Sequence, residues 1–273
     1  MRRVAVFQPV ENPYMKMLYE GVERSGDIPV AIPCQKEINL KGFDTALCWS
    51  MKKHPFIKSA RQAQVPLLVA EAGYLGDRGG NDRALGWEGI NGDADFCNQN
   101  VPSDRAQRWL PQMKPWKTGG EYILLCGQVL GDASLHRLHQ RLAAFYMITA
   151  KNLMQAYDLP VVFRPHPLWC PNNLPKWLTV SKDRSLQEDL EGAWLTVAWG
   201  SNSLVDATLA GCPTLAFDPI AMTWDISIHS VGQTPILPDR QEWLNRISYA
   251  QWTNDEFRDG TAWQHVRQYL ERV

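Results

Sequence analysis

Two basic residues follow a strand-like run of the sequence. The apolar stretch Val161-Val-Phe163 leads into Arg164-Pro-His-Pro167, where the prolines fix the local φ torsion. Arg164 offers a planar fork of donors that matches phosphate oxygens, and His166 offers a donor that also protonates a leaving oxygen. The pattern predicts a site for a phosphate, pyrophosphate or phosphoester. A surface turn with an ordinary histidine is the alternative.

A polar turn, Gly200-Ser-Asn-Ser203, opens a short predicted helix. Backbone N–H groups and hydroxyls at the start of a helix favour an anion, so Ser201, Asn202 and Ser203 are candidate ligands for it. The same residue types are the commonest helix N-caps, which is the structural alternative. Asp206 has the right type to accept hydrogen bonds from ribose hydroxyls, or to close a capping box with Ser203.

A third turn has the sequence Gly127-Gln-Val-Leu-Gly-Asp-Ala-Ser134 and follows a strand predicted over 122–126. Glycine in such a turn allows the backbone to approach a ligand closely. Gln128, Asp132 and Ser134 are therefore candidate ligands. Asp132 or Ser134 is equally suited to be only the cap of the next helix.

Two carboxylates follow a strand of the first half of the chain. Glu71 ends the run Pro66-Leu-Leu-Val-Ala70, and Asp77 lies in a Gly-flanked loop six residues later. A carboxylate opposite a phosphate site is suited to act as a general base, because it removes the proton of an attacking hydroxyl.

These groups are positioned by alternating strands and helices. The pattern predicts such elements over 3–7, 14–24, 45–49, 55–64, 66–70, 122–126, 134–157, 160–163, 194–199, 203–210 and 214–217. The alternation favours α/β units with parallel sheets. Because 101–120 is rich in Pro and Gly, we expect two Rossmann-like domains, 1–110 and 111–273, facing a central cleft, with 242–273 helical with loops.

Composition excludes several classes of protein. The chain has 273 residues, a formal net charge of −1 and 45% hydrophobic residues, so no global positive field recruits nucleic acid or an anionic membrane. Its apolar runs are too short for a transmembrane segment, and no secretion signal develops, so we expect a cytoplasmic protein. The six cysteines form no CxxC pair, and we expect buried, reduced thiols.

Metal binding has only weak signals in the sequence. Asp93-Ala-Asp95 matches the short DxD pattern of metal-dependent glycosyltransferases, and His136 and His139 lie three apart on the predicted long helix. The DxD pattern is short and common and lies here in a Gly- and Asn-rich loop, and the two histidines have no third ligand at matching spacing and suit a solvated helix face, so we expect no metal and no cofactor. Most of the 12 tryptophans, such as Trp109, are expected to pack in the core and loops, with a minority stacking on a ligand.

Four motifs in one order carry a family resemblance. Glu71-Ala-Gly-Tyr-Leu75, the turn Gly127–Ser134, Arg164-Pro-His-Pro167 and Gly200-Ser-Asn-Ser-Leu-Val-Asp-Ala207 together resemble the capsular polysaccharide biosynthesis family of Kdo transferases. No single piece is specific; the ordered set is. The resemblance covers 71–224 and implies a GT-B-like fold and glycosyl transfer from a nucleotide-sugar donor. The second half would bind the donor, through the candidate ligands named above, and the first half would present the acceptor.

The sequence also departs from the family pattern. The family typically reads Glu-Asp-Gly-Phe, whereas Ala72 replaces the Asp expected to be the catalytic base. Glu71 and Asp77 are the substitutes, and Glu71 is favoured because it ends a strand. Of an aromatic Gly-Trp-Gly segment only Trp224 is retained. A non-catalytic nucleotide or sugar-phosphate binding protein is the second hypothesis.

The acceptor is left open by the sequence. A surface glycan follows from the family resemblance. A hydroxymethylated pyrimidine in phage DNA is the other acceptor considered, because arginine-containing loops at 77–83 and 103–108 are suited to follow phosphates locally, although the net charge opposes DNA binding.

Overall fold

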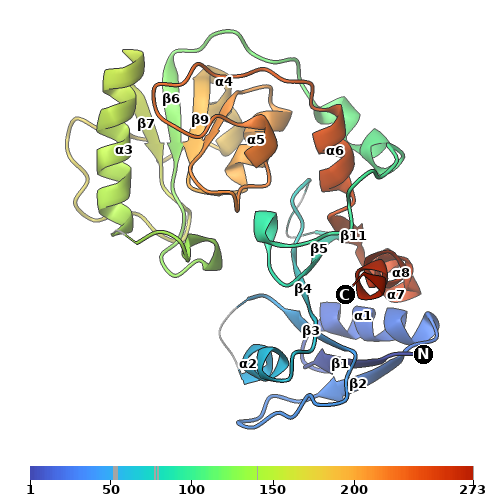
Figure 1. Ribbon diagram of the computed structural model, residues 1–273. Coiled ribbons are helices and arrows are strands. Elements are labelled where there is room, and N and C mark those ends of the chain that lie inside the picture. Colours follow the sequence, from blue (N-terminus) through green and yellow to red (C-terminus); the bar gives the residue numbers. More distant parts are fainter. Residues whose placement is uncertain (52–54, 77, 79, 140, 273) are drawn as a thin grey trace. The chain divides into compact units, whose positions relative to one another are not determined.

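The computed structural model describes residues 1–51, 55–76, 78, 80–139 and 141–272 (Figure 1). The chain divides into two compact units. Unit 1 comprises Met1–Arg105 and Asn245–Val273, and unit 2 comprises Ala106–Leu244. Each unit is an α/β layer structure around its own sheet, in agreement with the predicted fold class of two Rossmann-like domains.

Unit 1 is built on a six-stranded sheet in the order β11-β5-β4-β3-β1-β2. Strands β1 to β4 are parallel, and β5 and β11 run antiparallel to their neighbours. The bounds are β1 (Arg3–Phe7), β2 (Ile28–Ile32), β3 (Thr45–Trp49), β4 (Leu67–Ala72), β5 (Asp82–Trp87) and β11 (Gln251–Thr253). The central strands are buried on both faces, which is why they read as continuous apolar runs in the sequence.

Helices cover both faces of this sheet. Helix α1 (Pro13–Arg24) begins at Asn12, whose side chain accepts two backbone N–H groups, and its apolar side packs on the face that carries Val4 and Val6. Helix α2 (Pro55–Gln62) packs on the opposite face. The C-terminal helices α7 (Asn254–Asp259) and α8 (Thr261–Val266) join the core on the α1 face.

The C-terminal segment belongs to unit 1, which differs from the predicted domain 111–273. Strand β11 pairs with β5, two strands that the periodicity analysis did not predict. Arg105 fixes the segment: its guanidinium makes two bonds to the Glu256 carboxylate and donates to the carbonyls of Ser248 and Gln251. The first division, after Arg105, lies within the predicted connection 101–120, whereas the second, after Leu244, is set by the long-range pairing of the C-terminal segment with unit 1.

Protonation of His265 on α8 is expected to destabilise unit 1. Its Nε2 donates to the Cys97 carbonyl at 3.1 Å, and burial, helped by the nearby Arg105 charge, lowers its pKa from 6.5. Because the unfolded chain binds this proton more readily, stability is expected to fall as pH drops below about 6.5. Hydrogen exchange of α8 amides between pH 7.5 and 5.5 measures this. The fall should be smaller in His265→Gln than in the wild type, and equal slopes would contradict the assignment.

Unit 2 is built on a five-stranded, wholly parallel sheet in the order β10-β9-β6-β7-β8. The bounds are β6 (Tyr122–Cys126), β7 (Val161–Arg164), β8 (Thr179–Val180), β9 (Ala193–Ala198) and β10 (Thr214–Ala216). Helix α3 (Leu142–Tyr157) covers one face, and α4 (Leu186–Gly192) and α5 (Ser203–Leu209) cover the other (Figure 1). Helix α6 (Gln241–Ser248) carries the chain back to unit 1.

The long helix predicted over 134–157 begins eight residues later than expected. The segment Ala133–Leu135 is one 3-10 turn, capped by Asp132, and Leu138 continues it with an i→i+3 bond to Leu135. Leu135 and Leu138 still pack on the α3 side of the core, which explains the helical spacing of the apolar residues. Within this turn, Ser134 lies close to the end of β6, where its hydroxyl accepts a hydrogen bond from Gln128.

The prediction of free thiols agrees with the structure, but the prediction of burial is correct for only three of the six cysteines. Cys48, Cys126 and Cys212 are buried, Cys97 is partly buried, and Cys34 and Cys170 are exposed. Among the described residues, no helix combines the length and apolarity that crossing a bilayer requires.

Candidate functional site

The candidate site of unit 2 lies at the carboxyl edge of its parallel sheet. The chain starts at β6, adds β7 and β8 on one side, and then returns to add β9 and β10 on the other. Ligands of open α/β sheets bind outside the carboxyl ends of the strands, at such a change of direction. The three motifs predicted for this half of the chain lie at the ends of β6, β7 and β9, so all three are at this edge of the sheet.

Gln128 joins the loops on the two sides of the switch point. Its Oε1 accepts the N–H of Gly200 at 3.2 Å, and its Nε2 donates to Ser134 Oγ at 2.7 Å. Ser134 in turn donates through its N–H and Oγ to Asp132 Oδ1, at 2.9 and 2.8 Å. Gln128 and Ser134 are buried. These three side chains therefore hold the loops after β6 and β9 in register.

Two glycines allow the loops to pack this closely. A Cβ on Gly200 would lie 2.4 Å from Ile220 Cγ2, and one on Gly127 would lie 3.2 Å from the backbone nitrogen of His166. The Gly127 N–H also donates to the Arg164 carbonyl at 2.7 Å. A larger residue at Gly200 would displace the Ile220 side chain, and one at Gly127 would push against the backbone of His166, so the two glycines suit the close packing of these loops.

Arg164 is held by a buried carboxylate. Its Nη1 donates to Asp189 Oδ2 at 2.6 Å and to the Arg184 carbonyl at 2.7 Å. Asp189, on α4, is fully buried and also accepts from Ser181 Oγ at 2.6 Å, and Nε of Arg184 lies 3.4 Å from its Oδ1. Arg164 keeps 21% of its side chain exposed, so the ion pair fixes the guanidinium at the sheet edge without removing it from solvent.

The thiol of Cys126 connects Arg164 to the start of α5. Burial raises the Cys126 pKa to about 12, while a hydrogen bond with the Ser203 side chain and the charge of Arg164 act in the opposite direction. Cys126 and Arg164 are also register partners of β6 and β7. Ser203 and Arg164 therefore lie on the same face of the sheet, on either side of the Cys126 side chain.

His166 presents a defined nitrogen. Its Nδ1 accepts the backbone N–H of Leu168 at 3.1 Å, so in the neutral imidazole the proton is on Nε2. The His166 carbonyl accepts from Trp169 N–H at 2.9 Å, which closes the turn and fixes the ring. The partly exposed side chain thus offers an N–H donor at the end of β7.

The turn before α5 is ordered by its own hydroxyls. Ser203 donates to Ser201 Oγ through its N–H at 3.3 Å and its Oγ at 3.0 Å. A capping box between Ser203 and Asp206 requires Ser203 to be the N-cap residue. Asn202 is the N-cap and Ser203 is the first helical residue, so this capping box does not form. Asp206 lies in the first turn, partly buried.

In unit 1, Glu71 lies where the sequence predicts it. It is the penultimate residue of β4, near the carboxyl end of the strand, and it is half-buried. Its Oε1 accepts the Ala72 N–H at 3.1 Å. Its charge contributes to the raised pKa of the Cys48 thiol, which burial raises to about 12. Glu71 therefore faces the α2 side of the sheet, the side of Cys48. Asp77, the other predicted base, lies outside the described residues.

Several neighbours of these sites have no signal in the sequence. Asp189 lies within a helix, far along the chain from Arg164, so spacing does not reveal it. In unit 1, the Arg83 guanidinium lies 4.0 Å from the Tyr14 ring centroid, and Tyr14 stacks on Trp49 at 4.8 Å. This stack joins β5, α1 and the end of β3. Because Tyr14, Trp49 and Arg83 lie far apart in the sequence, their spacing does not predict that they pack together.

The weaker sequence motifs have structural partners. Asp95 Oδ1 accepts the Cys97 N–H at 2.7 Å and its Oδ2 lies 3.4 Å from an Arg272 nitrogen, and His136 Nδ1 lies 3.1 Å from the Ala133 carbonyl. Within the described part of the chain, no three His, Cys, Asp or Glu side chains are grouped to hold a metal ion.

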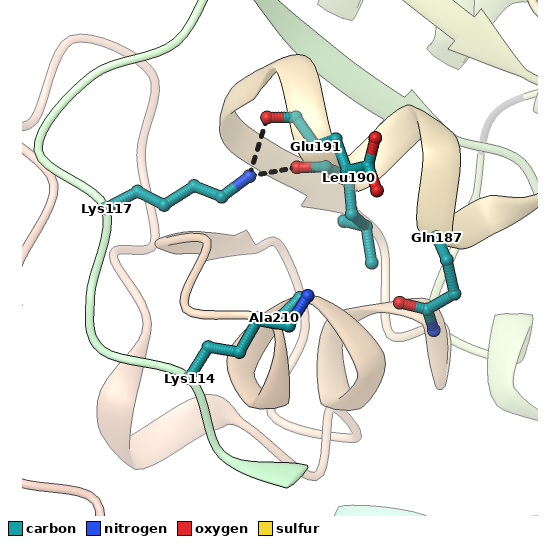
Figure 2. A pocket seen from close by; sticks show the side chains of 6 residues that line it. All are labelled: Lys114, Lys117, Gln187, Leu190, Glu191 and Ala210. Atoms are coloured by element: carbon teal, nitrogen blue, oxygen red, sulfur yellow. Dashed lines mark hydrogen bonds between the residues drawn. The ribbon is translucent and has the colours of Figure 1, made fainter.

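A small pocket of unit 2 lies away from the candidate site (Figure 2). It is lined by Lys114, Lys117, Gln187, Leu190, Glu191 and Ala210. Lys117 Nζ donates to the carbonyls of Leu190 and Glu191, the last turn of α4. Because α4 leads directly into the start of β9, this pocket lies at the amino ends of the strands. The lysine neutralises a helix C-terminus there.

Comparison with known proteins identifies the fold. No family model and no curated protein sequence matches the chain. Among solved structures, the β-Kdo 2,4 transferase of Thermosulfurimonas dismutans KpsC is similar, with a TM-score of 0.63 and 17% identity over 91% of this chain and 90% of that one. The β-Kdo 2,7 transferase of the same KpsC has a TM-score of 0.59 and 14% identity over 98% and 100%. The chain thus has the GT-B-like fold of these transferases.

Proposed function

We propose that this protein is a glycosyltransferase that uses a nucleotide-sugar donor. The observation that supports the proposal is that Arg164, His166 and the Gly200–Ser203 turn end or follow β7 and β9, the two strands beside β6, at the same carboxyl edge of the unit 2 sheet. All three are donors of hydrogen bonds or positive charge, so the site suits a phosphate. The fold shared with two Kdo transferases supports the same class of reaction.

In the proposed reaction, an acceptor hydroxyl attacks the anomeric carbon of the donor sugar. Glu71 takes the proton of that hydroxyl as the new C–O bond forms. The bond between the anomeric carbon and the phosphate oxygen breaks, and the phosphate leaves with the electron pair. Arg164, His166 Nε2–H and the N–H groups of the turn stabilise the negative charge that develops on the leaving phosphate. No step calls for a metal or another cofactor.

The proposed acceptor is a glycan hydroxyl. The experiment incubates the protein with a panel of nucleotide sugars and two acceptors, an oligosaccharide and DNA containing hydroxymethylcytosine, and measures a mass shift. A shifted oligosaccharide supports the proposal, and shifted DNA moves the acceptor to a modified base. Nucleotide binding with neither transfer to an acceptor nor hydrolysis of the donor would favour the non-catalytic alternative.

His166→Ala is expected to weaken nucleotide binding about tenfold or more with the fold intact. The variant removes one donor to a charged oxygen, and such bonds contribute about 1.5–3 kcal/mol. Calorimetry with the nucleoside mono- or diphosphate that the wild type binds measures the effect. His139→Ala, which removes an exposed histidine of the same unit, is the control. Unchanged affinity in His166→Ala would remove this residue from the site.

A further inference from the structure

A second arginine is held at the carboxyl edge of unit 2 by a buried aspartate. Arg137 Nη1 donates to Asp218 Oδ1 at 2.8 Å. Asp218 is buried and follows β10, whereas 43% of the Arg137 side chain is exposed. The arrangement repeats that of Arg164 and Asp189: a buried carboxylate of one element fixes a solvent-accessible guanidinium of another.

The carboxylate of Asp218 is set by its own turn. Its Oδ1 also accepts the Ile220 N–H at 2.9 Å, and the Asp218 N–H donates to the Trp199 carbonyl at 3.1 Å. Ile220 in turn packs against Gly200, close enough that a Cβ there would clash with it. Asp218 is therefore linked to the Gly200–Ser203 turn through two neighbours, Trp199, which precedes Gly200 in the chain, and Ile220, which packs against Gly200.

The backbone of Arg137 is tied to the same place from the other side. Leu135 and Leu138 pack into the core of unit 2, and Ser134 is bonded to Gln128, which accepts from Gly200. The guanidinium of Arg137 is thus linked to the neighbourhood of Gly200 through Asp218 and Ile220, and the backbone near Arg137 is linked to Gly200 through Ser134 and Gln128. A guanidinium fixed in this way offers its charge at a defined point at little entropic cost.

We propose that Arg137 contacts an anionic oxygen of the nucleotide-sugar donor, as a second cation beside the Gly200–Ser203 turn, and that Asp218 positions it. The inference rests on the proposed function and deepens it. Arg164 ends β7 and Asp218 follows β10, and these two strands are three strand spacings apart at about 4.8 Å each. The two arginines therefore flank the turn from opposite sides, which suits an extended ligand with charge along its length.

Arg137→Gln is expected to raise the dissociation constant of the bound nucleotide about 10- to 100-fold, the effect of losing a charge-assisted bond. Calorimetry with UDP, CMP, GDP and TDP, at two salt concentrations, measures it; the salt dependence of binding should also become shallower. Arg141→Gln removes the same charge from an exposed side chain four residues away and should change the dissociation constant less than twofold.

A double variant separates ligand contact from a structural role. Arg137→Gln alone leaves a buried carboxylate without its cation and is expected to lower the melting temperature, whereas Arg137→Gln/Asp218→Asn should restore it. Affinity that stays low in the double variant supports contact with the ligand. Affinity that returns with stability, or an Arg137→Gln variant that binds as the wild type does, overturns the inference. If the wild type binds no nucleotide but the melting temperatures follow the pattern, the proposed function fails instead.

Discussion

Glu71→Gln is expected to lower the rate of glycosyl transfer about 10²- to 10⁴-fold, the usual contribution of general base catalysis. Glutamine keeps the shape of the side chain at the end of β4 but cannot take a proton at neutral pH. Because the donor ligands proposed here are all in unit 2, the affinity for nucleotide should stay within twofold of the wild type. Initial rates with the donor and acceptor identified by the mass-shift experiment, together with calorimetry, check both parts.

Two further variants make this test specific. Glu23→Gln removes an exposed glutamate of α1 and should leave the rate unchanged. Asp77→Asn tests the other predicted base. A Glu71→Gln variant as active as the wild type would show that Glu71 is not the base, and a loss seen only in Asp77→Asn would assign the role to Asp77.

Asp189→Ala is expected to destabilise unit 2 by about 3–5 kcal/mol, the effect of removing one partner of a buried ion pair. Arg164 would lose the carboxylate 2.6 Å from its Nη1, and Ser181 would lose its acceptor. Protection of β7 and α4 amides from hydrogen exchange reports this change in the intact chain. Nucleotide affinity should fall as well, because Arg164 is no longer fixed at the sheet edge.

The size of this effect depends on burial. Asp183→Ala removes an exposed carboxylate of the loop before α4 and should change the free energy of opening by less than about 0.5 kcal/mol. Asp189→Asn, which retains an oxygen to accept from Ser181, should cost less than Asp189→Ala. Equal protection in Asp189→Ala and the wild type would mean that the pair contributes nothing to the stability of unit 2.

The sequence predicted the central parallel strands well, because each is a short apolar run that is largely buried. Two parallel strands at the sheet edges, β2 and β8, were missed, because they are partly exposed and neither is a buried apolar run. Strands β1, β3 and β6 have the expected bounds. It also predicted that Arg164, His166 and the Gly200–Ser203 turn lie at one edge, since parallel strands end together. Strands β5 and β11 were missed: Asp82–Trp87 contains two buried polar residues, and Gln251–Thr253 has three residues and no period to detect.

Local pattern determined the two α/β units and the residue types that end their strands, because the alternation of apolar runs is set by neighbours in the chain. Only the tertiary structure decided which partners those residues have. The return of Asn245–Val273 to unit 1, and the pairing of Arg164 with Asp189 and of Arg137 with Asp218, join segments 25 or more residues apart. Such contacts form because a buried carboxylate requires a cation, and the folded chain determines which one reaches it.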